Sequence, residues 1–143
     1  MLAQNFKSAA DLEITGAQKD ALIKTLVLLE TDRIQHVDVT KRRFDSTKPI
    51  EFDGMFSMAC WGSIAHECGT VACIGGTAEI VGKVSFGNPT THDASLAPGL
   101  YELFYARKII HSYDWNKINT AQAARALRSY LTTGDARWDL AVA

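Results

Sequence analysis

Residues 56–82 read FSMACWGSIAHECGTVACIGGTAEIVG, and this stretch decides the fold. Between Cys68 and Gly82 the only strongly polar side chain is Glu79, and most of the other residues are small. A helix that is apolar on nearly all sides is a buried helix, and small residues let neighbouring helices approach it closely. We therefore predict a central buried helix over residues 68–82.

The adjacent pair Gly75 and Gly76 conflicts with this predicted helix. Each glycine inside a helix lowers its stability by about 1 kcal/mol relative to alanine. Tertiary packing has to offset this local conflict, and such conflicts often mark a close backbone contact or a functional site. The pair is therefore expected to mark one of these two features.

Three further helices are predicted around the central one. The first covers residues 16–32, behind a capping box in which Thr15 and Gln18 satisfy free N–H groups reciprocally. Pro98 suits the first turn of the second helix, and Asn119 is a suitable N-cap for the third. Their apolar residues at helical spacing are Leu22, Ile23, Leu26, Val27 and Leu29, then Leu100, Leu103, Phe104 and Ile110, then Ala123, Ala124, Leu127 and Leu131.

Residues 33–55 differ in character from the predicted helices. β-branched residues alternate with polar ones around residues 36–40, and turn-forming residues follow. Two segments, Val37–Thr40 and Ile50–Phe52, are candidate strands of a short β-hairpin. An irregular loop is an equally good interpretation of this region.

The length and composition are those of a single globular domain. The chain has 143 residues, of which 47% are hydrophobic and 22% are charged. We interpret residues 1–14 as an N-terminal arm and residues 15–143 as one helical domain. The predicted fold class is mainly α: a compact bundle of about four helices around the buried small-residue helix, with or without the short β-hairpin.

Charge and hydropathy exclude several classes of function. The formal net charge is -1, which argues against a general nucleic-acid-binding protein, because such proteins usually carry a basic surplus. No apolar run approaches the roughly 18 residues that a membrane span requires. The first residues contain no apolar core of a secretory signal. We expect a cytoplasmic protein with reduced thiols, and the sequence predicts no cofactor.

Three cysteines and a histidine form the pattern Cys60-x5-His66-x-Cys68-x4-Cys73. One explanation is burial, since free cysteine behaves as a small hydrophobic residue. Another is zinc binding, since three cysteines and one histidine form a tetrahedral ligand set. The spacing argues against zinc: the pattern has no C-x2-C pair, and Cys68 and Cys73 would point to different faces of a continuous helix. These four residues are the only metal-ligand candidates, and we predict no metal site.

A third explanation makes Cys68 a nucleophile. At the start of the predicted helix, the helix dipole and free N–H groups would lower the pKa of its thiol, and the Gly69 and Thr70 amides would face an oxyanion. The string ECGTVACIGG loosely resembles the Cys-Gly turn that opens the central helix of papain-like cysteine peptidases. The chain lacks the upstream glutamine of that family. His92 and His111 are the only later histidines that can serve as its base.

A second resemblance covers about residues 54–138. Its parts are F-x-M-x-x-W from Phe56, C-G-T-x-x-C-I-x-G from Cys68, and a closing helix that ends near Gly134 and Trp138. This order is similar to a family of small bacterial and phage proteins with no established activity. The resemblance implies a small soluble domain of the kind that phages carry. It supplies no catalytic residue.

The run Lys41, Arg42, Arg43 is the one basic cluster. Such a run is usually a solvated loop, and its alternative role is to contact an acidic partner. Because the sequence shows no complete catalytic set and no cofactor fingerprint, we predict a non-catalytic protein. It would act by protein–protein contact, as an accessory or modulator protein of a phage or mobile element. The alternatives are a cysteine-nucleophile hydrolase that uses Cys68 and a zinc-stabilised domain.

Overall fold

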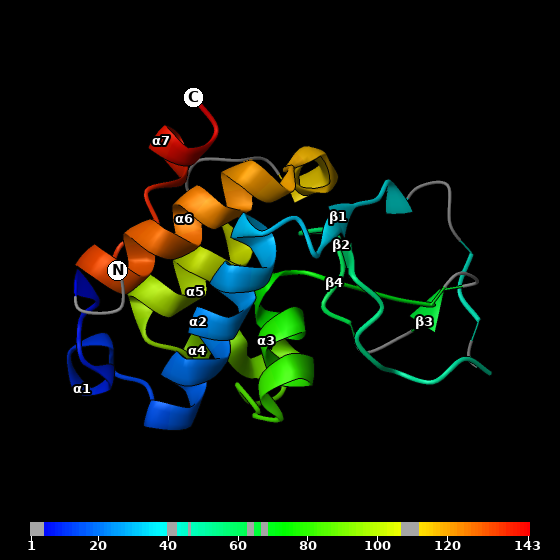
Figure 1. The fold of residues 1–143 in the computed structure, drawn as a ribbon. Helices are drawn as coiled ribbons and strands as arrows, with labels where there is room; N and C mark the ends of the chain where they lie inside the picture. Colours follow the sequence, from blue (N-terminus) through cyan, green and yellow to red (C-terminus); the bar gives the residue numbers. More distant parts are fainter. Residues whose placement is uncertain (1–4, 40–42, 46, 63–64, 67–68, 107–111) are drawn as a thin grey trace.

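The computed structural model describes residues 5–39, 43–45, 47–62, 65–66, 69–106 and 112–143 (Figure 1). The fold is mainly α, as predicted. The four longer helices are α2 (Gly16–Glu30), α3 (Ile74–Gly82), α5 (Pro98–Tyr105) and α6 (Thr120–Thr133). The short helices are α1 (Ala9–Leu12), α4 (His92–Ser95) and α7 (Trp138–Ala141), with 3-10 turns η3 (Pro89–Thr91) and η4 (Ser112–Lys117).

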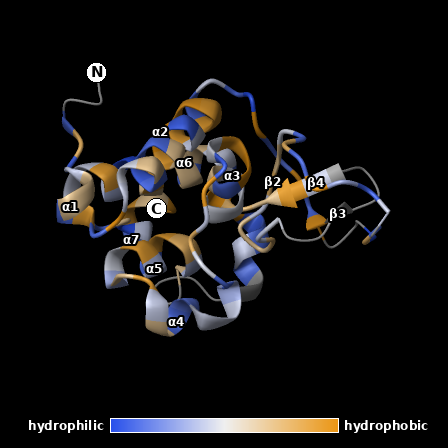
Figure 2. Cartoon of the chain, turned by 90° about the horizontal axis from the view of Figure 1, so that it is seen from below, coloured by the Kyte–Doolittle hydropathy of each residue, from blue (hydrophilic) through white to orange (hydrophobic). Residues whose placement is uncertain are grey.

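The strands are short and lie to one side of the helices (Figure 1 and Figure 2). They are β1 (Gln35–His36), β2 (Met55–Phe56), β3 (Ala65–His66) and β4 (Gly69–Ala72), in the sheet order β1-β2-β4-β3. The first three strands of that order are parallel, with His36 opposite Phe56 and Phe56 opposite Ala72, and β3 is antiparallel to β4. Strand β4 therefore ends immediately before α3 and positions its first turn.

The predicted hairpin in residues 33–55 is wrong. The candidate strands Val37–Thr40 and Ile50–Phe52 are not strands in the described residues, and Thr40 lies outside them. The region instead contributes β1 and β2, whose pairing is parallel. A parallel pair cannot be joined by a tight turn, so the chain between the two strands has to cross over.

The predicted start of the central helix is also wrong. Residues Gly69–Ala72 form β4, and α3 begins only at Ile74, after the N-cap Cys73. An apolar run of this length is compatible with either a buried strand or a buried helix. Pairing with β2 on one side and β3 on the other satisfies the backbone of residues 69–72, and this pairing makes them a strand.

The predicted starts of the other helices are confirmed, whereas α2 ends at Glu30 and not at residue 32, α5 ends at Tyr105, and Ile110 lies outside the described residues. Both sides of the capping box of Thr15 and Gln18 are formed at the start of α2. Pro98 lies in the first turn of α5, and Asn119 caps α6 through a second capping box with Gln122. Each of these signals acts within one helical turn, so it does not depend on the rest of the fold.

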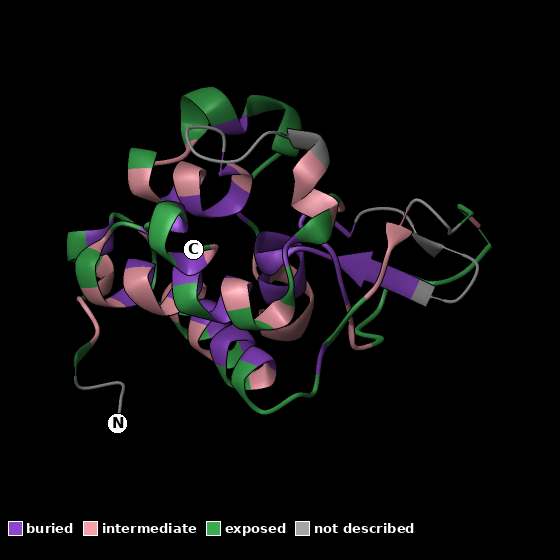
Figure 3. Ribbon diagram, turned by 90° about the horizontal axis from the view of Figure 1, so that it is seen from above, coloured by how far each residue is buried: buried purple, intermediate pink, exposed green. Residues whose placement is uncertain are grey.

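Buried residues lie on the sides of the helices that face one another (Figure 3). The closest approach is between α2 and α3, where a Cβ on Gly82 would overlap that of Ala21. The N-terminal segment packs on α6: the Lys7 amide donates to the Leu131 carbonyl at 2.8 Å, and Leu12 is buried. Within the described ranges, no helix has the combination of length and apolarity needed to cross a bilayer.

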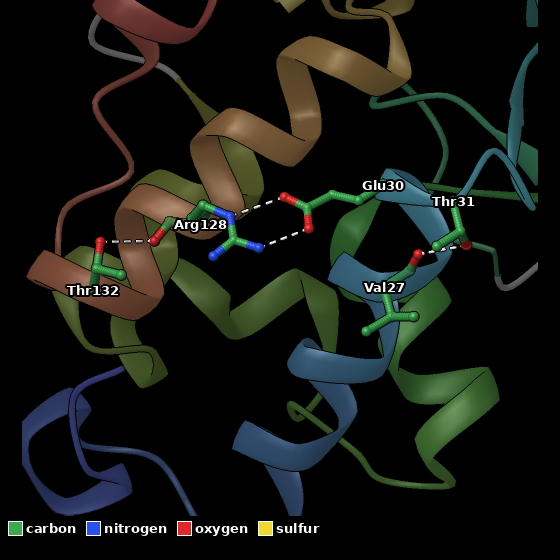
Figure 4. A network of polar contacts seen from close by, with 5 residues as sticks. All are labelled: Val27, Glu30, Thr31, Arg128 and Thr132. Carbon is green, nitrogen blue, oxygen red and sulfur yellow. Dashed lines mark hydrogen bonds and ion pairs between the residues drawn. The ribbon is translucent and has the colours of Figure 1, made fainter. Parts of the chain in front are cut away.

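An ion pair joins the surfaces of α2 and α6 (Figure 4). Arg128 donates from Nε to Oε2 of Glu30 at 2.9 Å and from Nη2 to Oε1 at 2.7 Å. Nearby, the hydroxyls of Thr31 and Thr132 donate to the carbonyls of Val27 and Arg128, one turn earlier in each helix. Because both charged side chains are partly exposed, the pair contributes at most about 1 kcal/mol.

Candidate functional site

The turn into α3 is the place where the sequence suggested chemistry. Its N-cap is Cys73, whose Sγ accepts a hydrogen bond from the Gly76 amide at 3.4 Å. The Cys73 amide in turn donates to the Cys60 carbonyl at 2.6 Å. Cys73 therefore holds the helix start and the preceding loop together, a role usually taken by serine, threonine, asparagine or aspartate.

Burial determines the protonation state of the Cys73 thiol. Cys73 is only 2% exposed, and burial raises its pKa to about 12 although the Gly76 and Gly75 amides act in the opposite direction. Burial also raises the pKa of Cys60. Because the thiolate is the nucleophile, neither thiol is activated near neutral pH. The explanation by burial is thus confirmed for Cys73.

The expected contact at Gly75 and Gly76 is made by Trp61. A Cβ on Gly76 would coincide with the Trp61 carbonyl, and a Cβ on Gly75 would overlap its indole ring. The Trp61 indole N–H donates to Oε1 of Glu79 at 2.8 Å, and Oε2 of Glu79 accepts from the Phe86 amide at 2.8 Å. The one strongly polar residue of α3 thus ties together the segments before and after the helix.

Trp61 is also the centre of an aromatic cluster. Its ring lies 5.3 Å from that of Phe104 and 6.2 Å from that of Tyr105, both on α5, and 4.9 Å from the His92 imidazole. Trp61, Phe104 and Tyr105 partly enclose, together with Trp115, a pocket of about 270 Å³ that also reaches Cys73. Cys73 and the Trp61 segment thus meet the aromatic end of α5 in space, although α5 lies far from them in the sequence.

His92 is positioned differently from a catalytic base. It is 1% exposed, with Nδ1 2.6 Å from the Tyr105 hydroxyl and Nε2 3.3 Å from the Gly87 carbonyl. A carbonyl only accepts, so Nε2 carries a proton, and in the neutral ring Nδ1 accepts from the hydroxyl. Both ring nitrogens are therefore engaged in holding α4 against α5. Its proposed nucleophile Cys68 and the alternative base His111 lie outside the described residues.

The expected oxyanion role of the Thr70 amide is wrong, because this amide is already occupied. It donates to Oδ2 of Asp53 at 2.6 Å. Zinc ligation has few described candidates: the structure does not describe Cys68 or the side chain of His66. Among the residues that it does describe, no group of three or more His, Cys, Asp or Glu side chains lies close enough to hold a metal ion.

A second site, which sequence reasoning missed, is a surface groove of about 410 Å³. It lies between α2, α3 and the segment that carries Phe52. Val27 is 50% exposed there and Phe52 is 40% exposed. The lining residues are Ile23, Lys24, Val27, Leu28, Arg33, Phe52 and Val81. Five of these seven are apolar, so hydrocarbon makes up most of the lining of the groove.

Thr70 positions the wall of this groove. Its hydroxyl accepts from the Glu51 amide at 3.0 Å and donates to the Pro49 carbonyl at 3.2 Å, while its own amide donates to Asp53. These three bonds fasten the segment on both sides of Phe52 to β4. The buried Thr70 of the Cys-Gly-Thr block therefore serves to hold a surface loop.

The charged residues that line the groove are both basic. Lys24 and Arg33 are exposed, and neither forms an ion pair within the part of the chain that the structure describes. Of the basic run predicted to contact a partner, Arg43 is exposed, and Lys41 and Arg42 lie outside the described residues. The groove thus has an apolar floor and a positive rim.

One signal in the sequence pointed to the groove. The apolar residues of α2 spread over more than one face, since Leu22, Leu26 and Leu29 are buried in the core while Val27 is not. Ile23 and Val27 are four residues apart, so they form a second apolar stripe on the helix surface.

Comparison of the chain with protein-family models, with curated proteins and with solved structures finds no match.

Proposed function

We propose that this protein is a non-catalytic domain that binds an acidic, partly apolar segment of a partner protein in the groove between α2, α3 and Phe52. The observation that carries the proposal is the combination, at the same groove, of exposed apolar side chains with two cations that form no ion pair among the described residues. Under this proposal it acts in the cytoplasm, as an accessory protein of a phage or mobile element. The resemblance of its Cys-Gly-Thr and Trp61 motifs to small phage and bacterial proteins supports that setting.

The apolar floor supplies the driving force. Covering exposed hydrocarbon contributes about 25 cal/mol per Å² of area removed from water. Val27 and Phe52 present such area without any rearrangement, because α2 is rigid and the Phe52 segment is fastened to Thr70. A groove that is already formed loses little conformational entropy when it is filled, which favours binding.

The two basic side chains at the rim of the groove determine which partner segments bind. Lys24 and Arg33 lie beside the apolar side chains with no carboxylate among the described lining residues to neutralise them. A segment with Asp or Glu next to a leucine or phenylalanine therefore fits, and a basic segment is repelled. Charges of this kind act mainly on the rate of association and on the choice of partner.

The two described thiols offer no activated nucleophile. The hydrolase alternative rests on Cys68, which lies outside the described residues, and the raised pKa values of Cys73 and Cys60 leave neither of them to take its place. His92 is buried, and its ring nitrogens are engaged by Tyr105 and Gly87.

A selection from a displayed library of random peptides tests the proposal. We expect the selected peptides to combine Asp or Glu with a large apolar residue. Calorimetry with a synthetic selected peptide should show at least a tenfold loss of affinity in the variants V27S/F52S and K24E/R33E.

Matched controls lie elsewhere on the surface. L140S removes an apolar side chain that is 61% exposed on α7, and K117E reverses an exposed charge on η4. Both should bind the peptide as the parent protein does. Selection of no peptide, selection of basic peptides, or equal weakening by the controls would each overturn the proposal.

A further inference from the structure

A separate cavity of about 450 Å³ lies between the first turn of α5 and the loop that joins α6 to α7. Its lining residues are Pro98, Gly99, Glu102, Gly134, Asp135, Arg137, Trp138 and Asp139. None of them lines the groove beside α2, so this cavity is independent of the proposed function. It contains three carboxylates and one guanidinium.

Glu102 has an unsatisfied carboxylate oxygen at this cavity. Its Oε2 is fully buried and has no hydrogen-bond partner among the described residues. Its backbone carbonyl, by contrast, accepts from the Ala106 amide at 2.8 Å and from the Trp138 indole N–H at 2.9 Å. Buried polar atoms almost always have partners, so an unpartnered carboxylate oxygen requires an explanation, and a bound group that donates hydrogen bonds is one.

The packing of the backbone around Glu102 leaves this residue little room to move away from the cavity. A Cβ on Gly99 would overlap the Gly134 carbonyl, so the start of α5 lies directly against the end of α6. Trp138 is buried and holds the Glu102 carbonyl from the other side. The carboxylate itself can still turn, because a terminal torsion of this type is broad. A half-turn only exchanges the two equivalent oxygens, but a partial turn moves Oε2 toward the cavity that Glu102 lines.

The cation in the lining does not neutralise Glu102. Arg137 donates to Asp139 through two hydrogen bonds of 3.0 and 2.7 Å, and its amide donates to Asp135 at 3.1 Å. This pairing lowers the pKa of Asp139, whose charge and that of Arg137 compensate each other. Glu102 forms no ion pair in the described lining, and the three carboxylates outnumber the one guanidinium, so the cavity attracts positive charge.

We infer that this cavity binds a protonated amine or a guanidinium group, which donates hydrogen bonds to Glu102. The group can belong to a free polyamine or to a lysine or arginine side chain of another protein. Besides Arg137, Lys7 lies close to this cavity, with side-chain carbons 3.9 Å from where a Cβ on Gly134 would lie. It forms no ion pair within the described residues.

An NMR titration tests the inference with three probes: spermidine, N-acetyl-lysine methylamide and N-acetyl-arginine methylamide. We expect shifts at residues 98–102 and 134–139, including the Trp138 indole N–H, which hydrogen-bonds to the carbonyl of Glu102. Tighter binding of spermidine would assign a free polyamine, and tighter binding of an amino-acid derivative would assign a protein side chain. Absence of binding by all three probes at millimolar concentration would overturn the inference.

The variant E102Q keeps the shape of the side chain and removes its charge. We expect at least a tenfold loss of probe affinity, with no loss in the control D20N, which changes an exposed carboxylate on α2. The ligand-free E102Q protein should have an equal or higher melting temperature, because the unpaired buried charge is gone. Unchanged probe affinity, or a lower melting temperature of the ligand-free variant, would instead assign Glu102 a structural role.

Lys7 provides a second test. If its ammonium fills the cavity in solution, K7M should destabilise the parent protein and leave E102Q unaffected in a double-mutant cycle. That coupling would overturn the inference, since the site would be occupied from within. We expect no coupling, and probe binding by K7M as tight as that of the parent protein.

Discussion

The turn into α3 and the groove beside α2 differ in how completely their groups are satisfied. At the turn, Cys73 caps the helix, Glu79 binds both Trp61 and Phe86, and His92 uses both ring nitrogens. At the groove, hydrocarbon is exposed and Lys24 has no ion-pair partner among the described residues. A satisfied cluster stabilises a fold, whereas unsatisfied groups at a surface are available to a partner.

This comparison changes the interpretation of the Cys-Gly-Thr block. In the sequence, the small residues and cysteines of this stretch were candidates for a catalytic or metal site. In the structure they allow close packing. Thr70 connects the two regions, because it belongs to the Cys-Gly-Thr block and also fastens the loop of Phe52. The motif therefore serves the groove indirectly, through the fold.

The largest expected effect comes from G76A. The Trp61 carbonyl occupies the place of the new methyl group, so the backbone has to move, and we expect a loss of about 3 kcal/mol or more in the free energy of unfolding. Denaturant unfolding measures this loss. G16A is the matched control, because Gly16 has open space around it and the change should be neutral or stabilising. Equal losses of unfolding free energy in G76A and G16A would contradict the close contact between Gly76 and the Trp61 carbonyl.

A smaller effect is expected from alkaline pH. The unfolded thiol of Cys73 ionises near its ordinary pKa of 9.0, while the folded thiol stays protonated up to about 12. The native state thus binds more protons above pH 9, and stability falls as pH rises. We expect a loss of about 2 kcal/mol between pH 8 and pH 10.5 from this thiol.

The comparison with C73S isolates this loss. The serine hydroxyl can cap α3 in the same way and does not ionise in this range. Other groups, such as Tyr130 with its raised pKa, contribute equally to both proteins. Unfolding curves from pH 8 to pH 10.5 should therefore be steeper in pH for the parent protein. Parallel curves would show that Cys73 is accessible enough to ionise in the folded state.

The smallest effect on stability is expected from T70V, which is also the sharpest test of how the two regions are linked. It removes the hydroxyl that binds Glu51 and Pro49, and we expect a loss of about 1 to 2 kcal/mol. Because the wall of the groove loosens, affinity for a selected acidic peptide should fall as well. T132V, whose hydroxyl bonds only within α6, should leave peptide binding unchanged. Unaltered peptide affinity in T70V would show that the Cys-Gly-Thr block does not support the binding groove.

The helices that could be predicted are those with local signals. The caps Thr15 and Asn119 act on amides three residues away, and Pro98 acts on its own backbone. The start of α3 could not be predicted in this way, because residues 69–72 become a strand only through pairing with β2 and β3. Apolarity marked these residues as buried and did not distinguish the two structures.

The candidate sites show the same division. The sequence by itself determined the helical class, the helix caps, and a close contact at Gly75 and Gly76, since these follow from the residues within a turn or from the absence of a side chain. Only the tertiary structure decided the protonated state of Cys73, the groove and the Glu102 cavity. Each of these depends on which distant segments exclude water from a side chain, and that quantity exists only once the chain is folded.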